Sequence, residues 1–377
     1  MESFGAPASL PEFARQDSPG HKVRQSPLLQ ALRGMAALDV AIAHIGEQAG
    51  ALAGRTGEPA YAWLHPLAQD VGVDVFFVIS GVVMVWSSLP LFGQPGAARR
   101  FAVRRLARVV PLYWIATLLL AVTTVVLPAL VSEPTPSLAL VLTSFLFLPW
   151  RRSDGLIQPL FRLGWTLNYE MLFYAIFTVF VGLPARWAMS AVLASVLSLA
   201  VVGWTLHPVT VLLVFWTDPI VLEFGMGVVL AALSLRLRLG IWWRVVLALV
   251  GLAGLAAADL WTATPRGIAY GLPCAAMVAA AILGPIRPAR SRAMRALVGL
   301  GDVSYALYLV HPFAMRALAF AWLRTGFVSR PGVLCYVALT TAASIVLAAV
   351  VHARLERKLT AWARRLGAPA VITATNR

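Results

Sequence analysis

The chain has 377 residues, of which 60% are hydrophobic and only 12% are charged, against about 25% charged residues in a soluble globular domain. This composition, with a mean hydropathy of +0.79, excludes a soluble globular protein, and the apolar content also excludes a disordered chain. The formal charge of +15 is often a sign of nucleic-acid binding. In a chain dominated by apolar runs, we interpret it first as a signal of membrane orientation.

The first 27 residues are polar and lack the short apolar core of a signal peptide. They are predicted to form a cytoplasmic tail before an uncleaved first span. A helix needs about 20 residues to cross the hydrocarbon layer, and the sequence offers about ten such stretches, which predicts an all-α polytopic membrane protein. These stretches are 28–48, 69–90, 109–131, 164–183, 187–206, 215–235, 241–260, 266–285, 297–319 and 333–353.

The expected organisation is a transmembrane domain over 28–353 and a second cytoplasmic tail over 354–377. The longest connection, 132–163, contains the apolar piece Ser137–Trp150, which is too short to span and is expected to be a re-entrant or interfacial helix. With the N-terminus inside, the cytoplasmic segments hold 23 of the 31 Lys and Arg residues. This asymmetry predicts that both termini are cytoplasmic.

Ionisable side chains inside the spans are conspicuous, because one charge at the centre of a membrane helix costs about 2.5–3.5 kcal/mol on insertion scales. Arg33 and His44 are eleven residues apart in the first span. Eleven residues of helix turn through about 1,100° and rise about 16 Å. The two side chains should therefore share one helix face, with Arg33 near the cytoplasm and His44 in the outer half of the membrane.

Other ionisable residues fall into two predicted layers. An outer-half layer should contain two histidines and three carboxylates, His44, His311, Asp74, Glu170 and Glu223. A cytoplasmic layer should contain the arginines Arg33, Arg104, Arg105 and Arg108. Guanidinium groups hold phosphates, and a histidine oriented by a carboxylate can act as a general base. The layers therefore suggest a phosphate-bearing donor that enters from inside and reaches toward His44.

Each of these residues also has a structural interpretation. A histidine inside a span can bond a backbone carbonyl, Glu170 and Glu223 can pair with aromatic or arginine groups, and Asp74 can cap the second span. The run Arg99–Arg108 can be a loop that only sets orientation. The role of Asp39, one turn before His44, is open.

Only two cysteines are present, Cys274 and Cys335. Two cysteines in apolar runs build neither a disulfide framework nor a cysteine-based zinc site. No metal cofactor and no nucleic-acid partner are expected.

Five sequence elements, in order along most of the chain, resemble the membrane-bound acyltransferase 3 family. They are the Arg-x10-His pair Arg33/His44, GVDVFFVISG at 72–81, RRFAVRRLARVVPLYW at 99–114, WTLNYEMLFY at 165–174 and LGDVSYALYLVHPF at 300–313. The segments FLFLPW and PIVLEFGMG look most like members that acetylate bacterial exopolysaccharide.

The resemblance implies an acyl-CoA donor, usually acetyl-CoA, and a carbohydrate hydroxyl as acceptor. It also implies that His44 is catalytic and that the arginines help to hold the donor. Our hypothesis places His44 as general base, oriented by Glu170 or else by Glu223, with Ser304, Tyr305 or Tyr308 stabilising an oxyanion or positioning the donor. An acyl-histidine intermediate is the alternative, and the sequence does not choose between the two.

Two other functions remain open at this stage. Ten spans with buried carboxylates also fit a transporter of sugars or lipid-linked glycans, although transporters often contain repeated halves and we find no repeat. The chain could also be a structural subunit of polysaccharide-synthesis machinery. The acyl group, the acceptor and the oligomeric state are not specified by the sequence.

Overall fold

A computed structural model describes residues 26–54, 71–126, 136–260, 264–327 and 329–367. Most of the predicted N-terminal tail and the last part of the predicted C-terminal tail, 368–377, therefore lie outside the described residues. The described part is almost entirely helical, and its only extended pairing is one isolated bridge between Arg151 and Ile157. The prediction of an all-α protein is confirmed.

Fifteen α-helices follow in order through the described part of the chain. They are α1 (Pro27–Gly54), α2 (Val71–Ser88), α3 (Ala97–Val126), α4 (Leu138–Phe145), α5 (Trp165–Phe180), α6 (Ala185–Leu206), α7 (Val211–Trp216), α8 (Val221–Ser234), α9 (Ile241–Ala257), α10 (Arg266–Ala269), α11 (Gly271–Ile282), α12 (Arg292–Asp302), α13 (Ser304–Leu323), α14 (Arg330–Val351) and α15 (Arg357–Gly367). Short 3₁₀ turns at Arg162–Gly164 and Ala258–Leu260 and a π-helical turn at His352–Glu356 complete the set.

Seven helical segments of the described chain are long and apolar enough to cross a membrane. They are Pro27–Gly54, Val71–Ser88, Ala97–Val126, Ala185–Leu206, Val211–Ser234, Ser304–Leu323 and Pro331–Leu366. The protein is thus a multi-pass membrane protein. The predicted count of ten is not confirmed, because the helices at three predicted spans are shorter: α5 has 16 residues, α9 has 17, and α10 with α11 covers Arg266–Ile282.

Two predicted spans are interrupted rather than continuous. The stretch 297–319 divides at Val303 into α12 and α13. The stretch 215–235 includes the end of α7 and all of α8. Between these two helices, Pro219 follows Asp218, whose Oδ1 accepts a hydrogen bond from the Ile220 amide at 2.9 Å. A proline and a side chain that bonds the next turn's amide both favour a break in a helix.

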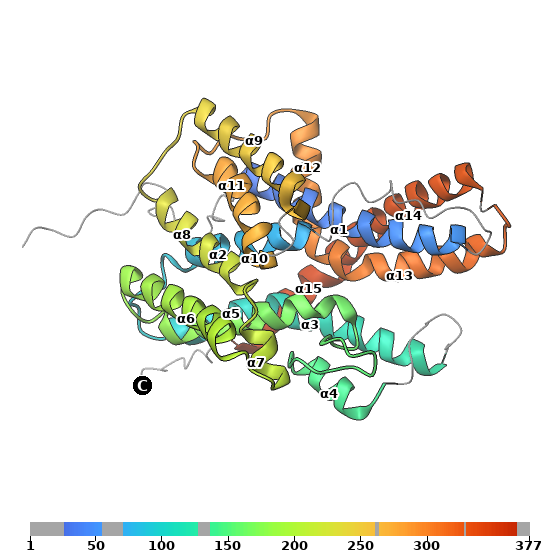
Figure 1. The fold of residues 1–377 in the computed structure, drawn as a ribbon, viewed down its shortest axis with the longest axis horizontal. Coiled ribbons are helices and arrows are strands. Elements are labelled where there is room, and N and C mark those ends of the chain that lie inside the picture. Colours follow the sequence, from blue (N-terminus) through green and yellow to red (C-terminus); the bar gives the residue numbers. More distant parts are fainter. Residues whose placement is uncertain (1–25, 55–70, 127–135, 261–263, 328, 368–377) are drawn as a thin grey trace, which may run out of the picture.

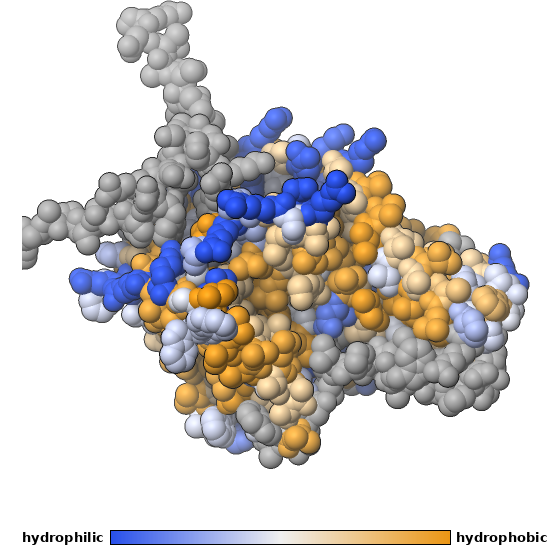
Figure 2. Space-filling model, turned by 90° about the horizontal axis from the view of Figure 1, so that it is seen from above, coloured by the Kyte–Doolittle hydropathy of each residue, from blue (hydrophilic) through white to orange (hydrophobic). Residues whose placement is uncertain are grey.

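The helix α1 is central in the bundle, where it packs against α2, α11, α12, α13 and α14 (Figure 1). On another side, α2 packs against α8, and α3 packs against α5 and α15. Large hydrophobic side chains are exposed along α3, α6, α9 and α14. One face of the molecule accordingly presents a broad hydrophobic surface, with its most hydrophilic residues in a band along one side (Figure 2). Such a surface is suited to a lipid environment.

Two glycines allow the contact between α2 and α8 to be unusually close. A Cβ on Gly81 of α2 would lie 2.3 Å from the Phe224 carbonyl oxygen, and one on Gly227 of α8 would lie 2.0 Å from the Val78 carbonyl oxygen. Both distances are far shorter than real Cβ contacts. Small residues of this kind let membrane helices approach with their backbones in contact.

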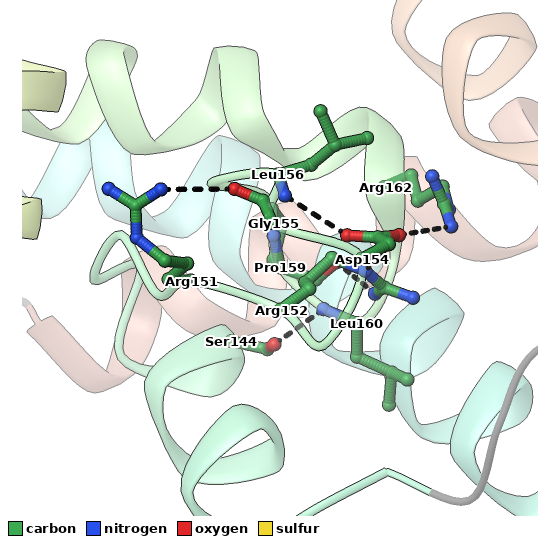
Figure 3. A network of polar contacts seen from close by, with 9 residues as sticks. All are labelled: Ser144, Arg151, Arg152, Asp154, Gly155, Leu156, Pro159, Leu160 and Arg162. Atoms are coloured by element: carbon green, nitrogen blue, oxygen red, sulfur yellow. Dashed lines mark hydrogen bonds and ion pairs between the residues drawn. The ribbon is translucent and has the colours of Figure 1, made fainter.

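The connection between α4 and α5 is a compact loop closed by its own polar groups (Figure 3). Asp154 accepts hydrogen bonds from the Leu156 amide at 3.1 Å and from Arg162 at 2.8 Å. Arg152 donates to the Pro159 carbonyl oxygen at 3.1 Å, and the Leu160 amide donates to the Ser144 hydroxyl at 2.8 Å. The eight-residue α4 is too short to span, so the loop and α4 form one small non-spanning unit next to the start of α5.

Candidate active site

A cavity of about 110 Å³ lies among α1, α2, α3, α5 and α13. Its apolar wall comes mainly from α2, through Val73, Phe76, Phe77, Ile79 and Val83. Its polar wall is formed by side chains from all five helices: Arg33, Ser80, Arg105, Arg108, Thr166, Glu170, Tyr174, Ser304, Tyr305 and Tyr308. Residues from the five sequence elements of the family resemblance therefore meet at one cavity.

Three of the four predicted donor-binding arginines line this cavity. Arg33 donates to Gln30 Oε1 at 2.9 Å and to the Ser304 hydroxyl at 3.3 Å, and Gln30 in turn donates to Asp302 at 2.7 Å. Arg33 is thereby held against the start of α13. Arg108 also lines the cavity and forms no hydrogen bond or ion pair with any described residue, so its guanidinium donors are available to a ligand.

Arg105 is held more tightly than Arg108. It donates to the Val83 carbonyl oxygen at 3.1 Å and to the Ser87 hydroxyl. Its guanidinium carbon lies 5.6 Å and 6.0 Å from the ring centroids of Phe101 and Tyr174, within the range of cation–π attraction. Arg104, the fourth predicted donor ligand, is exposed and is not among the cavity-lining residues. On a helix, adjacent residues point about 100° apart, so Arg104 and Arg105 face different surroundings.

Glu170 lies at this arginine-rich end of the cavity. Its carboxylate accepts a hydrogen bond from the Tyr174 hydroxyl one turn later on α5, and it interacts electrostatically with Arg33 and Arg105. The expected contact between Glu170 and His44 does not occur among the described residues. The alternative of aromatic and arginine partners is the one found for Glu170, because the depth of a residue along its helix does not specify which neighbour its side chain faces.

The hydroxyl groups of α13 are bonded to the protein itself. The Tyr305 hydroxyl donates to the Val109 carbonyl oxygen at 2.7 Å. The Tyr308 hydroxyl lies 2.8 Å from both the Leu163 carbonyl oxygen and the Thr166 hydroxyl. Ser304 accepts from Arg33, as described above. In this conformation all three residues form and brace the cavity wall.

The two predicted histidines lie together. The His44 and His311 rings have centroids 5.4 Å apart, and the His311 ring lies 6.4 Å from that of Tyr308. Since Arg33 contacts Ser304 and His44 contacts His311, α1 and α13 run in the same direction. The histidine pair is therefore one helical turn beyond the Tyr308 end of the cavity, and the arginines are at the other end.

Both histidine rings have the same hydrogen-bonding arrangement. His44 Nδ1 lies 2.8 Å from the Val40 carbonyl oxygen, and His311 Nδ1 lies 2.9 Å from the Leu307 carbonyl oxygen. Because a carbonyl oxygen only accepts, each Nδ1 carries a proton, and Nε2 is the ring nitrogen left for another partner. His311 is fully buried, and its Nε2 has no hydrogen-bond partner among the described residues.

Asp74 and Glu223 belong to a different cluster, which also contains Arg266. The Arg266 side chain donates to both carboxylate oxygens of Asp74, at 3.1 Å and 2.7 Å. Asp74 and Glu223 are both completely buried and interact electrostatically. Neither oxygen of Glu223 has a hydrogen-bond partner in the described part of the chain. The expected pairing of Glu223 with His44 is thus not observed. Asp74, for which a cap of the second span was the alternative, is paired with Arg266 instead.

Asp39, whose role the sequence left open, accepts a hydrogen bond from the Gly72 amide at 3.0 Å. It therefore satisfies one of the free amide groups in the first turn of α2. A Cβ on Gly72 would lie 2.2 Å from the Ala36 carbonyl oxygen, so glycine is required for this close contact of α1 and α2.

Sequence reasoning missed several residues of the site. Arg266 begins an apolar run at the same predicted depth as Asp74. The opposite charges of these two residues at equal depth could have identified Arg266 as a partner of Asp74. Tyr174 is one turn from Glu170 and could have been found by its spacing. Glu356, which is buried and interacts electrostatically with Arg33, follows the last predicted span and gave no such signal.

No group of three His, Cys, Asp or Glu side chains within the described segments is placed to hold a metal ion.

Comparison with known proteins decides the family. A family model for an acyltransferase domain matches residues 28–349, which include the cavity and the histidine pair. The chain belongs to the acyltransferase 3 family. It is an acyltransferase, and the family resemblance of the five sequence elements is confirmed.

Two curated relatives agree with this assignment. The chain is 33% identical over 276 residues to the exopolysaccharide production protein ExoZ of Rhizobium meliloti, covering 70% of this chain and 81% of the relative. It is 27% identical over 340 residues to the acyltransferase MdmB of Streptomyces mycarofaciens, covering 78% of this chain and 80% of the relative. No solved structure matches the chain.

Proposed function

We propose that this acyltransferase moves an acyl group, most simply acetyl, from acyl-CoA to a hydroxyl of a cell-surface or exported carbohydrate such as exopolysaccharide. The protein would act in the cell (inner) membrane with both termini in the cytoplasm. The observation that carries the proposal is the cavity itself: cationic side chains surround one end, and two histidines whose Nδ1 atoms are bonded to backbone carbonyls lie beyond the other end. The similarity to the exopolysaccharide production protein of Rhizobium supports the choice of acceptor.

The donor would enter at the arginine end. Arg33, Arg105 and Arg108 supply the positive charge that the phosphates of CoA require. An engineered protein cavity of about 150 Å³ holds one benzene molecule, so a cavity of about 110 Å³ is far too small for a nucleotide. It suits the narrow acyl-bearing arm of the donor, with the nucleotide outside. The helical distance of about 16 Å from Arg33 to His44 separates the phosphate end from the reacting end.

The reaction would then be a general-base acyl transfer. His44 Nε2 removes the proton from the acceptor hydroxyl while the hydroxyl oxygen attacks the thioester carbonyl carbon. The bond from carbon to sulfur breaks, the ester forms, and the thiolate of CoA takes up the proton from His44. Such general-base assistance typically contributes a factor of about 10²–10⁴ to the rate.

An acyl-histidine intermediate uses the same free Nε2 lone pair. In that route Nε2 attacks the thioester first, the thiolate leaves, and the acceptor hydroxyl displaces the acyl group from the ring. His311, with a second unpartnered Nε2 beside His44, is positioned to take the hydroxyl proton in this second step.

The remaining polar residues would position the donor and the helices around the cavity and would not take part in the bond changes. Glu170, through Tyr174 and the arginines, would orient the donor end. Ser304, Tyr305 and Tyr308 fix the wall that guides the acyl arm. Asp74 and Glu223, with Arg266, would hold α2, α8 and α10 around that wall.

The proposal is tested with purified protein in nanodiscs, labelled acetyl-CoA and acceptor polysaccharide. Transfer of label to the polymer is expected, and label trapped on His44 before acceptor is added would select the acyl-histidine route. Movement of glycan across the membrane without covalent transfer would overturn the proposal in favour of a transporter.

A further inference from the structure

The apolar wall of the cavity is one face of α2. Phe76, Ser80 and Val83 line the cavity, and their spacing of four and three residues places them on the same side of the helix. From Val71 to Val85 these three residues alone are partly exposed, and all the others are buried. Seven residues of helix rise about 10 Å, so Phe76 and Val83 lie toward opposite ends of the cavity.

The contacts of these two residues identify the ends. Val83 is at the arginine end, because its carbonyl oxygen accepts a hydrogen bond from Arg105 at 3.1 Å. Phe76 is at the histidine end, because its ring lies edge-on to the ring of Tyr308 with the centroids 6.4 Å apart, and the Tyr308 ring is 6.4 Å from that of His311. Neither histidine of the pair lines the cavity. The way from the cavity to the histidine pair therefore leads past the rings of Phe76 and Tyr308.

The two rings are held to different degrees. The Tyr308 hydroxyl is held by the two contacts to the start of α5 described above. Phe76 has no polar atom to anchor it, and the Tyr308 ring is its one ring contact with a described residue. The adjacent Phe77, by contrast, is buried against three aromatic rings of α5. The size of the Phe76 side chain is accordingly what can widen or narrow this passage without loss of an anchored contact.

The acyl group of the donor has to pass these rings, since its thioester carbon must come within about 3–3.5 Å of the attacking atom beside the histidine pair. We propose that Phe76 determines the size of the acyl group that the enzyme transfers. Its ring admits acetyl and excludes butyryl and longer chains. This inference rests on the proposed function and narrows the donor to acyl-CoA with a short acyl chain.

The experiment measures kcat/KM in nanodiscs for acetyl-CoA and for butyryl-CoA with the same acceptor polysaccharide. One methylene group in an apolar pocket changes kcat/KM by about 10–200-fold, so the wild type should prefer acetyl-CoA by about tenfold or more. In Phe76→Ala, kcat/KM for butyryl-CoA should rise by about tenfold or more, and the preference for acetyl-CoA should disappear. Val83→Ala is the matched control, because it enlarges the same face of α2 at the arginine end. It should keep the wild-type ratio between the two donors.

A gain of activity with butyryl-CoA cannot come from unfolding. If Phe76→Ala does not fold, Phe76→Leu decides the question, because leucine remains apolar and removes less volume. Its kcat/KM for propionyl-CoA should exceed that of the wild type, and the absence of this gain would overturn the proposal.

Equal use of acetyl-CoA and butyryl-CoA by the wild type would also overturn it. The same holds for a folded Phe76→Ala enzyme with the wild-type ratio between the donors, and for a Val83→Ala enzyme that gains butyryl-CoA as strongly as Phe76→Ala. A wild-type enzyme that uses neither donor would contradict the proposed function itself, which is a different result from an enzyme that uses both alike.

Discussion

At the scale of single residues, the site depends on which polar atoms the protein satisfies itself and which it leaves for a ligand. Backbone carbonyls accept from Nδ1 of both histidines, and this fixes the Nε2 lone pairs on the reacting side. Tyr305 is bonded to a carbonyl oxygen, but Arg108 has no partner among the described side chains. Under the proposed function, the histidines would supply the base and Arg108 would supply a cation for a phosphate-bearing donor.

Replacement of Arg33 tests the donor end. Arg33→Gln removes a cationic group that lines the cavity and its bond to Ser304. Hydrogen bonds to charged groups contribute about 1.5–3 kcal/mol, so KM for acyl-CoA should rise about tenfold or more. Arg100→Gln is the control, because Arg100 is exposed on α3 and bonds only the Pro95 carbonyl oxygen. Equal KM values for the two variants would place the donor elsewhere.

Asp154 gives a prediction about pH. The hydrogen bond from the Leu156 amide, followed by Arg162 and Arg152, lowers the pKa of Asp154 below its ordinary value of 3.8. The loop stability from this carboxylate is therefore fully present above pH 3.8 and is lost as the pH falls through the lower pKa of the folded protein.

Hydrogen exchange of the Leu156 amide, corrected for its intrinsic rate, should accordingly be equally slow at pH 5 and pH 7. In Asp154→Ala it should be faster at both pH values, while amides of α6 exchange as in the wild type. An amide as protected in Asp154→Ala as in the wild type would show that Asp154 does not hold the loop.

The residue scale also shows what the sequence could and could not predict. The 3.6-residue period placed Arg33 and His44 on one face of α1, and both do face α13. Depth along a helix did not predict lateral neighbours: Glu170 turned toward the arginines, and Asp74 and Glu223 gathered at Arg266. Those contacts depend on helix rotation and packing order, which one sequence does not contain.

At the scale of elements, glycine contacts determine how closely α2 and α8 approach each other. Positions Gly81 and Gly227 face each other across this contact with no room for a methyl group. Since α2 supplies most of the apolar wall of the cavity, its distance from α8 sets where that wall stands.

Two glycines on α8 provide a matched test. Gly227→Ala would place its Cβ 2.0 Å from a backbone oxygen, whereas Gly225→Ala would place it no closer than 3.4 Å to the Val196 side chain. We expect Gly227→Ala to destabilise the protein by about 1–3 kcal/mol, while Gly225→Ala stays neutral or gains stability from helix propensity. Thermal unfolding in nanodiscs measures the difference, and equal melting temperatures would contradict the close contact.

Helix existence was predictable at every expected span, but helix continuity was not. A helix lies at each of the ten apolar runs, but only seven helical segments of the described chain are long enough to span, and Pro219 with Asp218 and the junction at Val303 divide two of the runs. The π turn at His352–Glu356 is equally absent from the hydropathy pattern. These interruptions arise from local hydrogen bonding and packing, to which average hydropathy is insensitive.

At the scale of the whole molecule, the distribution of positive charge predicts which side of the membrane the arginine end of the cavity faces. Of the 31 Lys and Arg residues, 23 lie in segments predicted to be cytoplasmic, the arginines of α3 and α15 among them. The predicted orientation would expose the arginine end of the cavity to the cytoplasm, where the proposed acyl-CoA donor would bind.

Cysteine labelling of whole cells tests the orientation. In a Cys274→Ala, Cys335→Ser background, Ser153→Cys should react with a membrane-impermeant maleimide in spheroplasts. Arg290→Cys should react only after the membrane is permeabilised. Both positions are exposed in the structure, so accessibility depends on the side of the membrane. The opposite pattern would invert the predicted topology and move the donor site to the outside.

The most direct test of the account is acyl transfer by a His44→Ala enzyme. We predict that kcat falls by a factor of about 10²–10⁴ at normal expression and an unchanged KM for acyl-CoA, because the arginine end of the cavity is intact. The control variant is His207→Asn. His207 is exposed and has a left-handed backbone conformation with φ 43°, which asparagine tolerates. This variant should transfer acyl groups at the wild-type rate. A His44→Ala enzyme that acylates the polymer at the wild-type rate would contradict the central claim.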